Sequence, residues 1–433
     1  MSGALLDQTT STATFERQYR GASGFEGLRQ QAWADFQRQG IPTRHDEEWR
    51  FTPLRTLAET TFFEADGDLV RFDTLAAPEG VCRLCFVNGV FDPSRSALNL
   101  LPAGVTFGLA SEMSSDLEAK VGSLARTDAA PFAALNTACF GDVAWLRVAK
   151  GTPSEIAIEF LFLTESTDRP AVVHPRLLVV VEPFAQASII ERYESVGTVL
   201  VNAVVEIYLA EGAQLEHSLI QLESDSAHHI ATTKARQERD SVWTHNNIGF
   251  GARIARNDID TYLNGENVHA WLNGLAVASG EQLLDSHTRI DHAMPNCNTF
   301  EVYKHVLDGR ASAVFNGKIF VHQDAQKTDA KQTNQTLLLS PAATINSKPQ
   351  LEIFADDVKC THGATVGQLR EDALFYLRAR GIPESEARAL LVYAFGGEVL
   401  EHITLESLRA EMEERLFAKV RTRYELPGRD GAD

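Results

Sequence analysis

The sequence predicts a mainly β protein with helical ends, and three observations support this fold class. Short runs of β-branched and aliphatic residues follow one another from Val143 to Leu339, with no convincing helix between them. Apolar residues at helical spacing come before this region, and they return after Gly367. We therefore expect an α-rich N-terminal domain over residues 1–142, a β core over 143–366 and a C-terminal helical domain over 367–433.

The N-terminal domain begins with helical periodicity. Leu28, Ala32 and Phe36 recur every four residues, and Gly40 follows as a natural helix end. The next expected elements are a strand over Val81–Val90 with the turn signal Asn88-Gly89, and short helices over Asp116–Leu124 and Pro131–Cys139. Helices therefore dominate the expected structure of this domain.

The β core is expected to contain many short strands. They are Ile156–Leu163, Leu177–Glu182, Ser188–Tyr193, Val199–Leu209, Val242–Ile248, Ala270–Leu275, Ala313–Val321 and Gln335–Leu339. Several turns resemble one another: Pro183–Gln186, Glu211–Gln214, Gln323–Gln326 and Ser340–Ala343. Such a series allows a sandwich, a barrel or a β-solenoid. We favour the solenoid, because the sequence has few of the Asn-Gly or Asp-Gly links that join antiparallel strands, and because stacked coils bury their apolar faces on one another.

Three helices are expected in the C-terminal domain. Leu374, Phe375 and Leu377 are expected on one side of the first helix. The expected boundaries are Gly381 at the end of the first helix, Pro383 and Gly396-Gly397 for the second, and Thr404 as the cap of the third. The apolar residues of the third helix are Leu405, Leu408, Met412, Leu416 and Val420.

The composition excludes some classes of partner. The chain has 40 Lys and Arg residues against 59 Asp and Glu, a net charge of −19, which argues against nucleic acid as a ligand. Apolar runs such as Leu177–Val181 are too short to span a membrane, and the first residues lack the pattern of a secretory signal. Five cysteines, an odd and sparse set, indicate reduced thiols. We therefore expect a cytoplasmic protein.

Common catalytic motifs are missing. Gly317-Lys318 is followed by Ile319 and has no glycine at position 312, so it is not a phosphate-binding loop. The dinucleotide-binding, nucleophile-elbow and His-Glu-x-x-His patterns are also absent from the sequence. These absences favour a chain that does not hydrolyse ATP and is not an enzyme of a common class.

Most of the histidine and cysteine pairs are interpreted as structural. These are Cys82 and Cys85 as packed thiols on a strand, His228 and His229 in a solvated loop, and His292 and Cys297 at a turn between strands. Residues three apart on a strand point to opposite faces, which argues against shared ligation by the first pair.

Cys360 and His362 form the most informative pair. Leu351–Cys360 has the composition of a short strand, and residues two apart on a strand share a face. Thiolate and imidazole are good ligands for iron or zinc, and Lys359 or the imidazole is expected to lower the pKa of the thiol. Two ligands are too few for a metal, so the others would come from elsewhere in the fold or from another chain. Packing explains the same residues equally well.

The segment Ser347–Gly367, which contains this pair, closely resembles the SufD family of iron–sulfur cluster assembly proteins. The resemblance extends over further segments: Asp46–Arg50, Pro53-Leu54, Leu307–Arg310, Phe315–Lys318, Ala325–Ala330, Gln332–Asn334, Ala373–Arg378 and Gly381-Ile382. It therefore reaches both ends of the chain, and its dense part covers residues 263–400.

The resemblance implies a right-handed parallel β-helix that pairs with a SufB-like subunit, or with a second copy when SufB is absent. It implies an ABC-type ATPase, SufC, docked on the C-terminal helices, and we assign the docking to Phe375, Tyr376, Arg378 and Arg380. It also implies that Cys360 and His362 lie at the SufB interface, where they would act as tentative ligands of transient iron or a nascent cluster. No intrinsic cofactor is expected.

The expected function is that of a non-catalytic scaffold subunit that aids iron entry, with ATP hydrolysis supplied by SufC. Two alternatives remain at this point. One is a scaffold of the paralogous SufB type. The other is a free-standing β-helix enzyme that acts on polysaccharide, which the fold alone would permit.

Overall fold

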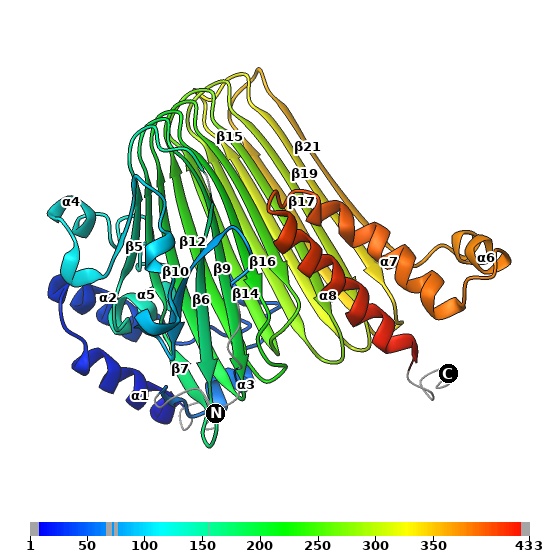
Figure 1. Cartoon of the computed structure of the whole chain (residues 1–433), viewed down its shortest axis with the longest axis horizontal. Coiled ribbons are helices and arrows are strands. Elements are labelled where there is room, and N and C mark those ends of the chain that lie inside the picture. Colours follow the sequence, from blue (N-terminus) through cyan, green and yellow to red (C-terminus); the bar gives the residue numbers. More distant parts are fainter. Residues whose placement is uncertain (1–7, 66–71, 73–76, 155, 426–433) are drawn as a thin grey trace.

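A computed structural model of the chain describes residues 8–65, 72, 77–154 and 156–425. Its centre is a parallel β-solenoid in which successive strands alternate between two sheets, as Figure 1 shows. Each long strand therefore pairs with the strand two places further along the chain, in register and in parallel, as β10 does with β12 and β11 with β13. The predicted mainly β fold, with helices at both ends, is confirmed.

The first sheet is built mainly from even-numbered strands. Its main path contains β4 (Val105–Gly108), β5 (Ala144–Val148), β8 (Arg176–Val181), β10 (Val199–Leu209), β12 (His228–Gln237), β14 (Ile254–Leu263), β16 (Leu283–His292), β18 (Ser312–Val321) and β20 (Thr344–Ile353). Two short strands attach to its side: β1 (Phe63–Glu64) and β7 (Ala171–Val173).

The second sheet lies opposite the first. Its order is β3 (Val90–Asp92), β2 (Val81–Val87), β6 (Ala157–Glu165), β9 (Gln186–Val196), β11 (Gln214–Gln221), β13 (Val242–Gly249), β15 (His269–Ala278), β17 (Asn298–Leu307), β19 (Asp329–Leu338) and β21 (Lys359–Gly367). Alternate residues of both sheets point inward, because successive side chains on a strand face opposite sides. They form one apolar core along the solenoid.

Helices cover the two outer faces. The N-terminal elements are α1 (Gln8–Gly21), α2 (Glu26–Gln39), η1 (Glu47–Trp49), α3 (Arg55–Glu59), η2 (Pro93–Arg95), η3 (Leu98–Leu100), η4 (Ala110–Glu112), α4 (Ser115–Glu118) and α5 (Pro131–Cys139). Phe36 and Phe132 from these helices pack against Leu200 and Ile230 on the outer side of the first sheet. The N-terminal helices are thus fastened to the solenoid by an apolar layer of their own.

The C-terminal helices are α6 (Glu371–Ala379), α7 (Glu384–Leu400) and α8 (Glu406–Glu425). Helices α7 and α8 lie across the outer face of the second sheet, where Val392 and Leu416 join a cluster with Ile220 and Leu275 (Figure 1). Among the described residues, no helix is both long and apolar enough to cross a bilayer.

Several expected boundaries match the structure. Strand β10 covers Val199–Leu209 and helix α5 covers Pro131–Cys139, as predicted, and α2 ends before Gly40. Asn88 and Gly89 form the turn between β2 and the antiparallel β3. Cys82 and Cys85 are buried on β2, as the sequence indicates. The turn expected between His292 and Cys297 joins β16 to β17.

Other expectations are wrong. His228 and His229 are not in a solvated loop: both are buried in β12, and burial lowers the pKa of His228 to about 4. The expected helix over 116–124 stops at Glu118. Helix α7 continues to Leu400 instead of ending at Gly396-Gly397. A Cβ at Gly396 would lie 2.9 Å from Leu416 and 3.4 Å from Leu275, so this glycine allows α7 to pack closely rather than ending it.

Candidate functional site

The solenoid has an open end at its last coil. Strand β20 pairs only with β18, and β21 pairs only with β19, among the residues that the structure describes. Nearly every residue of these two strands is half-buried or exposed, whereas the strands before them are mostly buried. Their outer edges therefore present backbone groups that no strand of the described residues satisfies.

The open end holds both candidate ligands. Cys360 and His362 lie on β21 on the face that points into the solenoid, where they are in register with Ala330 and Gln332 of β19. Cys360 is half-buried at the end of the apolar core, whereas His362 is exposed. The strand differs from the expected one, because β20 ends at Ile353 and β21 begins only at Lys359.

The electrostatic environment of Cys360 is opposite to the expectation. Burial raises the pKa of the Cys360 thiol, and the negative charge of Asp329 raises it further. Neither Lys359 nor an imidazole is among the groups that shift this pKa, so the surroundings of Cys360 favour the protonated thiol.

The metal-binding capacity of this chain alone is limited. Within the described ranges, no group of three His, Cys, Asp or Glu side chains is arranged to hold a metal ion. The His362 imidazole forms no hydrogen bond or ion pair with any described residue. Cys360 and His362 therefore supply at most two ligands at the open end.

A buried polar pair lies behind His362. Gln332 follows Glu301 in register on the inner face, and its Nε2 donates a 2.6 Å hydrogen bond to Glu301 Oε2. Burial raises the pKa of Glu301 to about 7. Neither Glu301 nor Gln332 has a signal in the sequence that marks it as part of the site. Only the strand register, which depends on the length of each turn, brings them behind His362.

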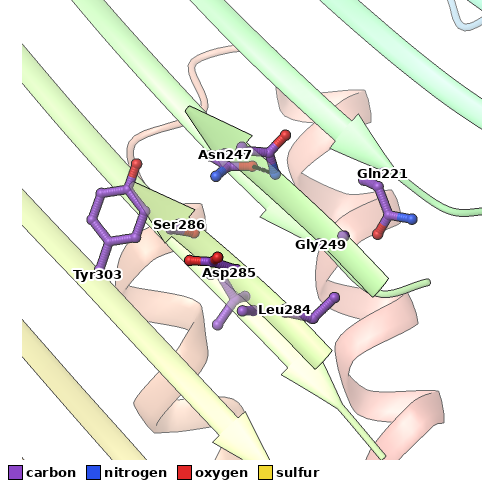
Figure 2. Close-up of a pocket in the computed structure, with 11 residues that line it drawn as sticks. Gln221, Asn247, Gly249, Leu284, Asp285, Ser286 and Tyr303 are labelled. Atoms are coloured by element: carbon purple, nitrogen blue, oxygen red, sulfur yellow. Dashed lines mark hydrogen bonds between the residues drawn. The ribbon is translucent and has the colours of Figure 1, made fainter. Parts of the chain in front are cut away.

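A small cavity lies inside the solenoid, two coils away from the open end. Figure 2 shows Asn247, Asp285, Ser286 and Tyr303 around it. Its volume is about 10 Å³, which suits one water molecule. The buried Tyr303 hydroxyl has no hydrogen-bond partner among the described residues, so a water there would satisfy it.

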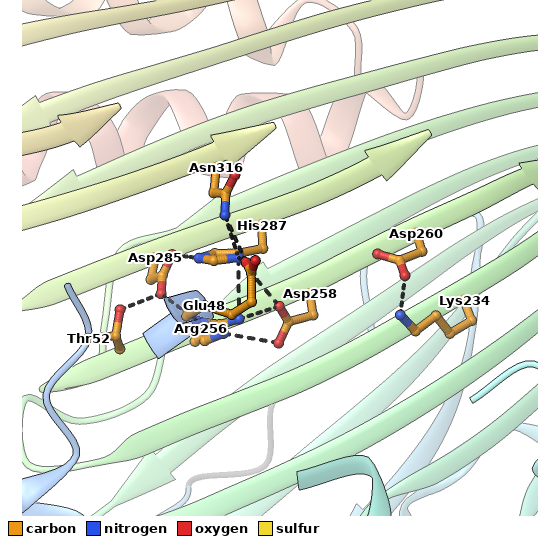
Figure 3. Close-up of polar contacts among 9 residues, drawn as sticks. All are labelled: Glu48, Thr52, Lys234, Arg256, Asp258, Asp260, Asp285, His287 and Asn316. Atoms are coloured by element: carbon orange, nitrogen blue, oxygen red, sulfur yellow. Dashed lines mark hydrogen bonds and ion pairs between the residues drawn. The ribbon is translucent and has the colours of Figure 1, made fainter. Parts of the chain in front are cut away.

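A charged cluster fastens the N-terminal segment to the outer side of the first sheet. Figure 3 shows Glu48 facing His287, with a 3.4 Å ion pair between Oε2 and Nδ1. His287 Nε2 is also 3.1 Å from Asp285, and Thr52 donates a hydrogen bond to the same carboxylate. Burial lowers the pKa of His287, because it disfavours the charged ring. The carboxylates of Asp285 and Glu48 stabilise that charge more strongly, so the pKa of His287 is raised to about 9. The segment that resembles the SufD family near residue 48 thus has a docking role within this chain.

Helix α6 presents the residues assigned to ATPase docking. Phe375 is 75% exposed and Tyr376 is 56% exposed, while Leu374 packs inward, so Phe375 does not share the face of Leu374 as expected. Arg380 stacks over the Tyr376 ring at 4.6 Å, and Arg378 pairs with Glu384 at 3.0 Å. Figure 1 shows α6 projecting away from the solenoid.

The fold and the open end define a parallel β-solenoid protein with helical ends, and comparison with known proteins places it in a family. Residues 162–395 match the family model described as SUF system FeS cluster assembly, SufBD core domain. The chain belongs to the SufBD family of iron–sulfur cluster assembly proteins.

Individual relatives support the resemblance to SufD. The chain is 38% identical over 393 residues to an iron–sulfur cluster assembly SufBD family protein of Synechocystis sp., with 86% of each chain covered. It is 32% identical over 385 residues to SufD of Escherichia coli, with coverage of 88% and 89%. It is 27% identical over 302 residues to SufD of Bacillus subtilis, with 68% of each chain covered. The prediction of a SufD-like protein is confirmed.

Proposed function

We propose that this chain is a non-catalytic SufD-like subunit that pairs with a SufB-like subunit and aids the entry of iron into a nascent cluster. The observation that carries the proposal is the open end, where two free strand edges and the pair Cys360 and His362 occur together. Family membership and the relatives named SufD support this role over a SufB-type scaffold or a polysaccharide enzyme.

Pairing through the open end follows from backbone chemistry. The free edges of β20 and β21 offer N–H and C=O groups to strands of a partner. Ile353 and Val366, 38% and 54% exposed, add apolar contact area at the same end. A second copy of this chain would meet the same edges when no SufB-like subunit is present.

The site would then be completed across the interface. The protonated Cys360 thiol loses its proton when iron binds, and His362 contributes a ring nitrogen. The partner supplies the remaining ligands, because the described residues of this chain bring two to the open end. Iron and the growing cluster are the cargo of the site and not a resident cofactor.

Nucleotide hydrolysis belongs to another polypeptide in this proposal. Phe375 and Tyr376 on α6 form an exposed aromatic surface, and Arg378 and Arg380 lie beside them. Exposed aromatic and arginine side chains are enriched where proteins bind each other. We assign this helix to an ABC-type ATPase, SufC, and place the whole assembly in the cytoplasm.

The test is anaerobic purification of the tagged chain with its partners, followed by assays of bound iron and sulfide. The His362→Ala variant is expected to recover the same partners but to lose most of the cluster. His402→Ala, which changes an exposed histidine between α7 and α8, is the matched control and is expected to behave like the wild type. Wild-type cluster yield from His362→Ala, or recovery of the chain without partners, contradicts the proposal.

A further inference from the structure

Three polar residues follow one another along the inner face of the solenoid toward its open end. Glu301 of β17 is in register with Gln332 of β19, which is in register with His362 of β21. Adjacent strands in a sheet are about 4.8 Å apart, so each of these side chains lies beside the next. We call Glu301, Gln332 and His362 the inner row.

Two buried acceptors of the inner row have no hydrogen-bond partner among the described residues: Glu301 Oε1 and, next to the position of His362, Gln332 Oε1. The Gln332 side chain is 2% exposed, and its Nε2 donates to Glu301 Oε2, which leaves Oε1 as a free acceptor. Gln332 Oε1 forms no hydrogen bond with any residue that the structure describes. A buried carbonyl without a partner is costly, so Gln332 Oε1 gains stability from any donor that reaches it.

The position of this amide is fixed by the facing strand. A Cβ at Gly317 of β18 would lie 2.2 Å from Gln332 Nε2, so the absence of a side chain there makes room for the amide. With Nε2 directed to Glu301, Oε1 is the atom of this amide that is left to serve the next position of the inner row, which is His362.

We propose that Glu301 and Gln332 are positioning residues for His362, such that Gln332 Oε1 accepts the N–H of one ring nitrogen and leaves the other nitrogen for iron. The exposed imidazole turns inward to make this bond, a rotamer change open to surface side chains. Metal-bound histidines commonly donate their second N–H to a carbonyl or carboxylate, which fixes the tautomer. This inference rests on the proposed function of His362.

A neighbouring row provides a matched control. Tyr303, Asn334 and Ala364 occupy the positions two residues further along the same three strands. Asn334 is a buried amide like Gln332, and its Oδ1 likewise has no hydrogen-bond partner among the described residues, but its row ends at alanine and has no imidazole to hold. Replacing Asn334 therefore disturbs the same strand and the same face without affecting the orientation of His362.

The first measurement is NMR of the full chain, labelled with ¹⁵N in its histidine rings, in mildly alkaline buffer. The His362→Ala spectrum assigns the His362 signals. We expect the His362 ring to occupy one tautomer in the wild type. In Gln332→Met we expect both tautomers, as in an imidazole that is exposed to solvent. Asn334→Leu is expected to match the wild type, and so is Glu301→Gln, whose amide oxygen still accepts from Gln332. Gly317→Ala, which displaces the Gln332 amide, replaces Gln332→Met should that variant fail to fold.

The second measurement is cluster yield from the assembled complex. Gln332→Met is expected to lower it about tenfold, while Asn334→Leu leaves it unchanged. A His362 tautomer that is mixed in the wild type, or unchanged in Gln332→Met, overturns the positioning role. Wild-type cluster yield from His362→Ala overturns the proposed function instead, and the tautomer measurement still decides whether Gln332 holds the ring.

Discussion

The two ends of the solenoid differ in whether another strand covers their strand edges. At the first end, the antiparallel strand β3 covers β2, and the antiparallel β4 covers β5. At the last end, β20 and β21 have no further strand of the described chain beside them. Exposed edges invite pairing with other chains, and proteins normally block them. The first end is therefore closed within this chain, whereas the described residues leave the outer edges of β20 and β21 uncovered.

The largest effect is expected from a substitution that blocks the free edge of β21 and so reduces binding of a partner. Lys359 N donates to Thr328 O, so the N–H of Lys359 faces the β19 side. N–H groups alternate in direction along a strand, so those of residues 361, 363 and 365 also face β19. The N–H of Ala364 therefore points to the free edge. Ala364→Pro removes one outward N–H and is expected to lower recovery of the partner by about a hundredfold, on the order of 3 kcal/mol. Pull-down with quantitative mass spectrometry measures this loss.

The neighbouring position is the control for this change. The N–H of Thr365 points to β19, so Thr365→Pro is expected to destabilise the chain itself. Thr344 N donates to Ala311 O, the residue just before β18, so the N–H groups an odd number of residues further along β20 face its free edge. Pro349 occupies one of these outward positions, which shows that such a position tolerates proline. Normal partner recovery by a folded Ala364→Pro variant would show that the open edge of β21 does not pair.

The second prediction compares apolar side chains at the two ends. Leu84 on β2 is fully buried, whereas Val366 on β21 is 54% exposed. Leu84→Ala is expected to lower the free energy of unfolding of the isolated chain by about 3 kcal/mol, and Val366→Ala by less than about 0.5 kcal/mol. Urea denaturation measures both values. Equal losses would mean that the open end is already packed in the isolated chain.

The third prediction concerns the N-terminal segment, which reaches the coils near the open end. Glu48 pairs with His287 of β16, and Glu47 pairs with Lys348 of β20 at 2.8 Å. The pKa of His287 is about 9, above the value of about 6.5 for an unfolded histidine. The stabilisation from His287 is therefore complete below about pH 6.5 and is lost as the pH rises through 9.

Protonated His287 is expected to contribute on the order of 2–3 kcal/mol to the free energy of unfolding. The difference in unfolding free energy between the wild type and His287→Gln, measured from pH 6 to pH 10, is expected to shrink across that interval. Lys348→Gln, which removes the exposed pair with Glu47, is expected to change stability by less than about 1 kcal/mol. A difference that does not change with pH would show that His287 is neutral in the folded chain.

Part of the fold was predictable from local sequence. Strands such as β10 are rich in valine and isoleucine, so their β-branched residues predict them almost to the residue. The sequence does not predict β12, β14, β16 and β17, whose inner and outer positions both carry polar side chains. Those side chains are buried by neighbouring coils and by the N- and C-terminal helices, and this burial has no local signal in the sequence.

The candidate site was likewise predictable from the sequence only in part. The spacing of Cys360 and His362 alone places them on one face of a strand, because side chains alternate with a period of two. Their surroundings were not predictable from the spacing. The pKa of Cys360 is raised by burial and by Asp329, a residue far from it in the sequence, which reverses the effect expected from the adjacent Lys359.

The sequence by itself determined the fold class, the helical ends and the identity of the two candidate ligands, since these depend on periodicity and on residue type. Tertiary structure decided which coil stays open and which side chains share the inner row with His362. The physical reason is that the register between stacked strands decides which residues of different coils lie side by side. The turns differ in length from coil to coil, so only the stacked strands show that Glu301 and Gln332 lie behind the histidine.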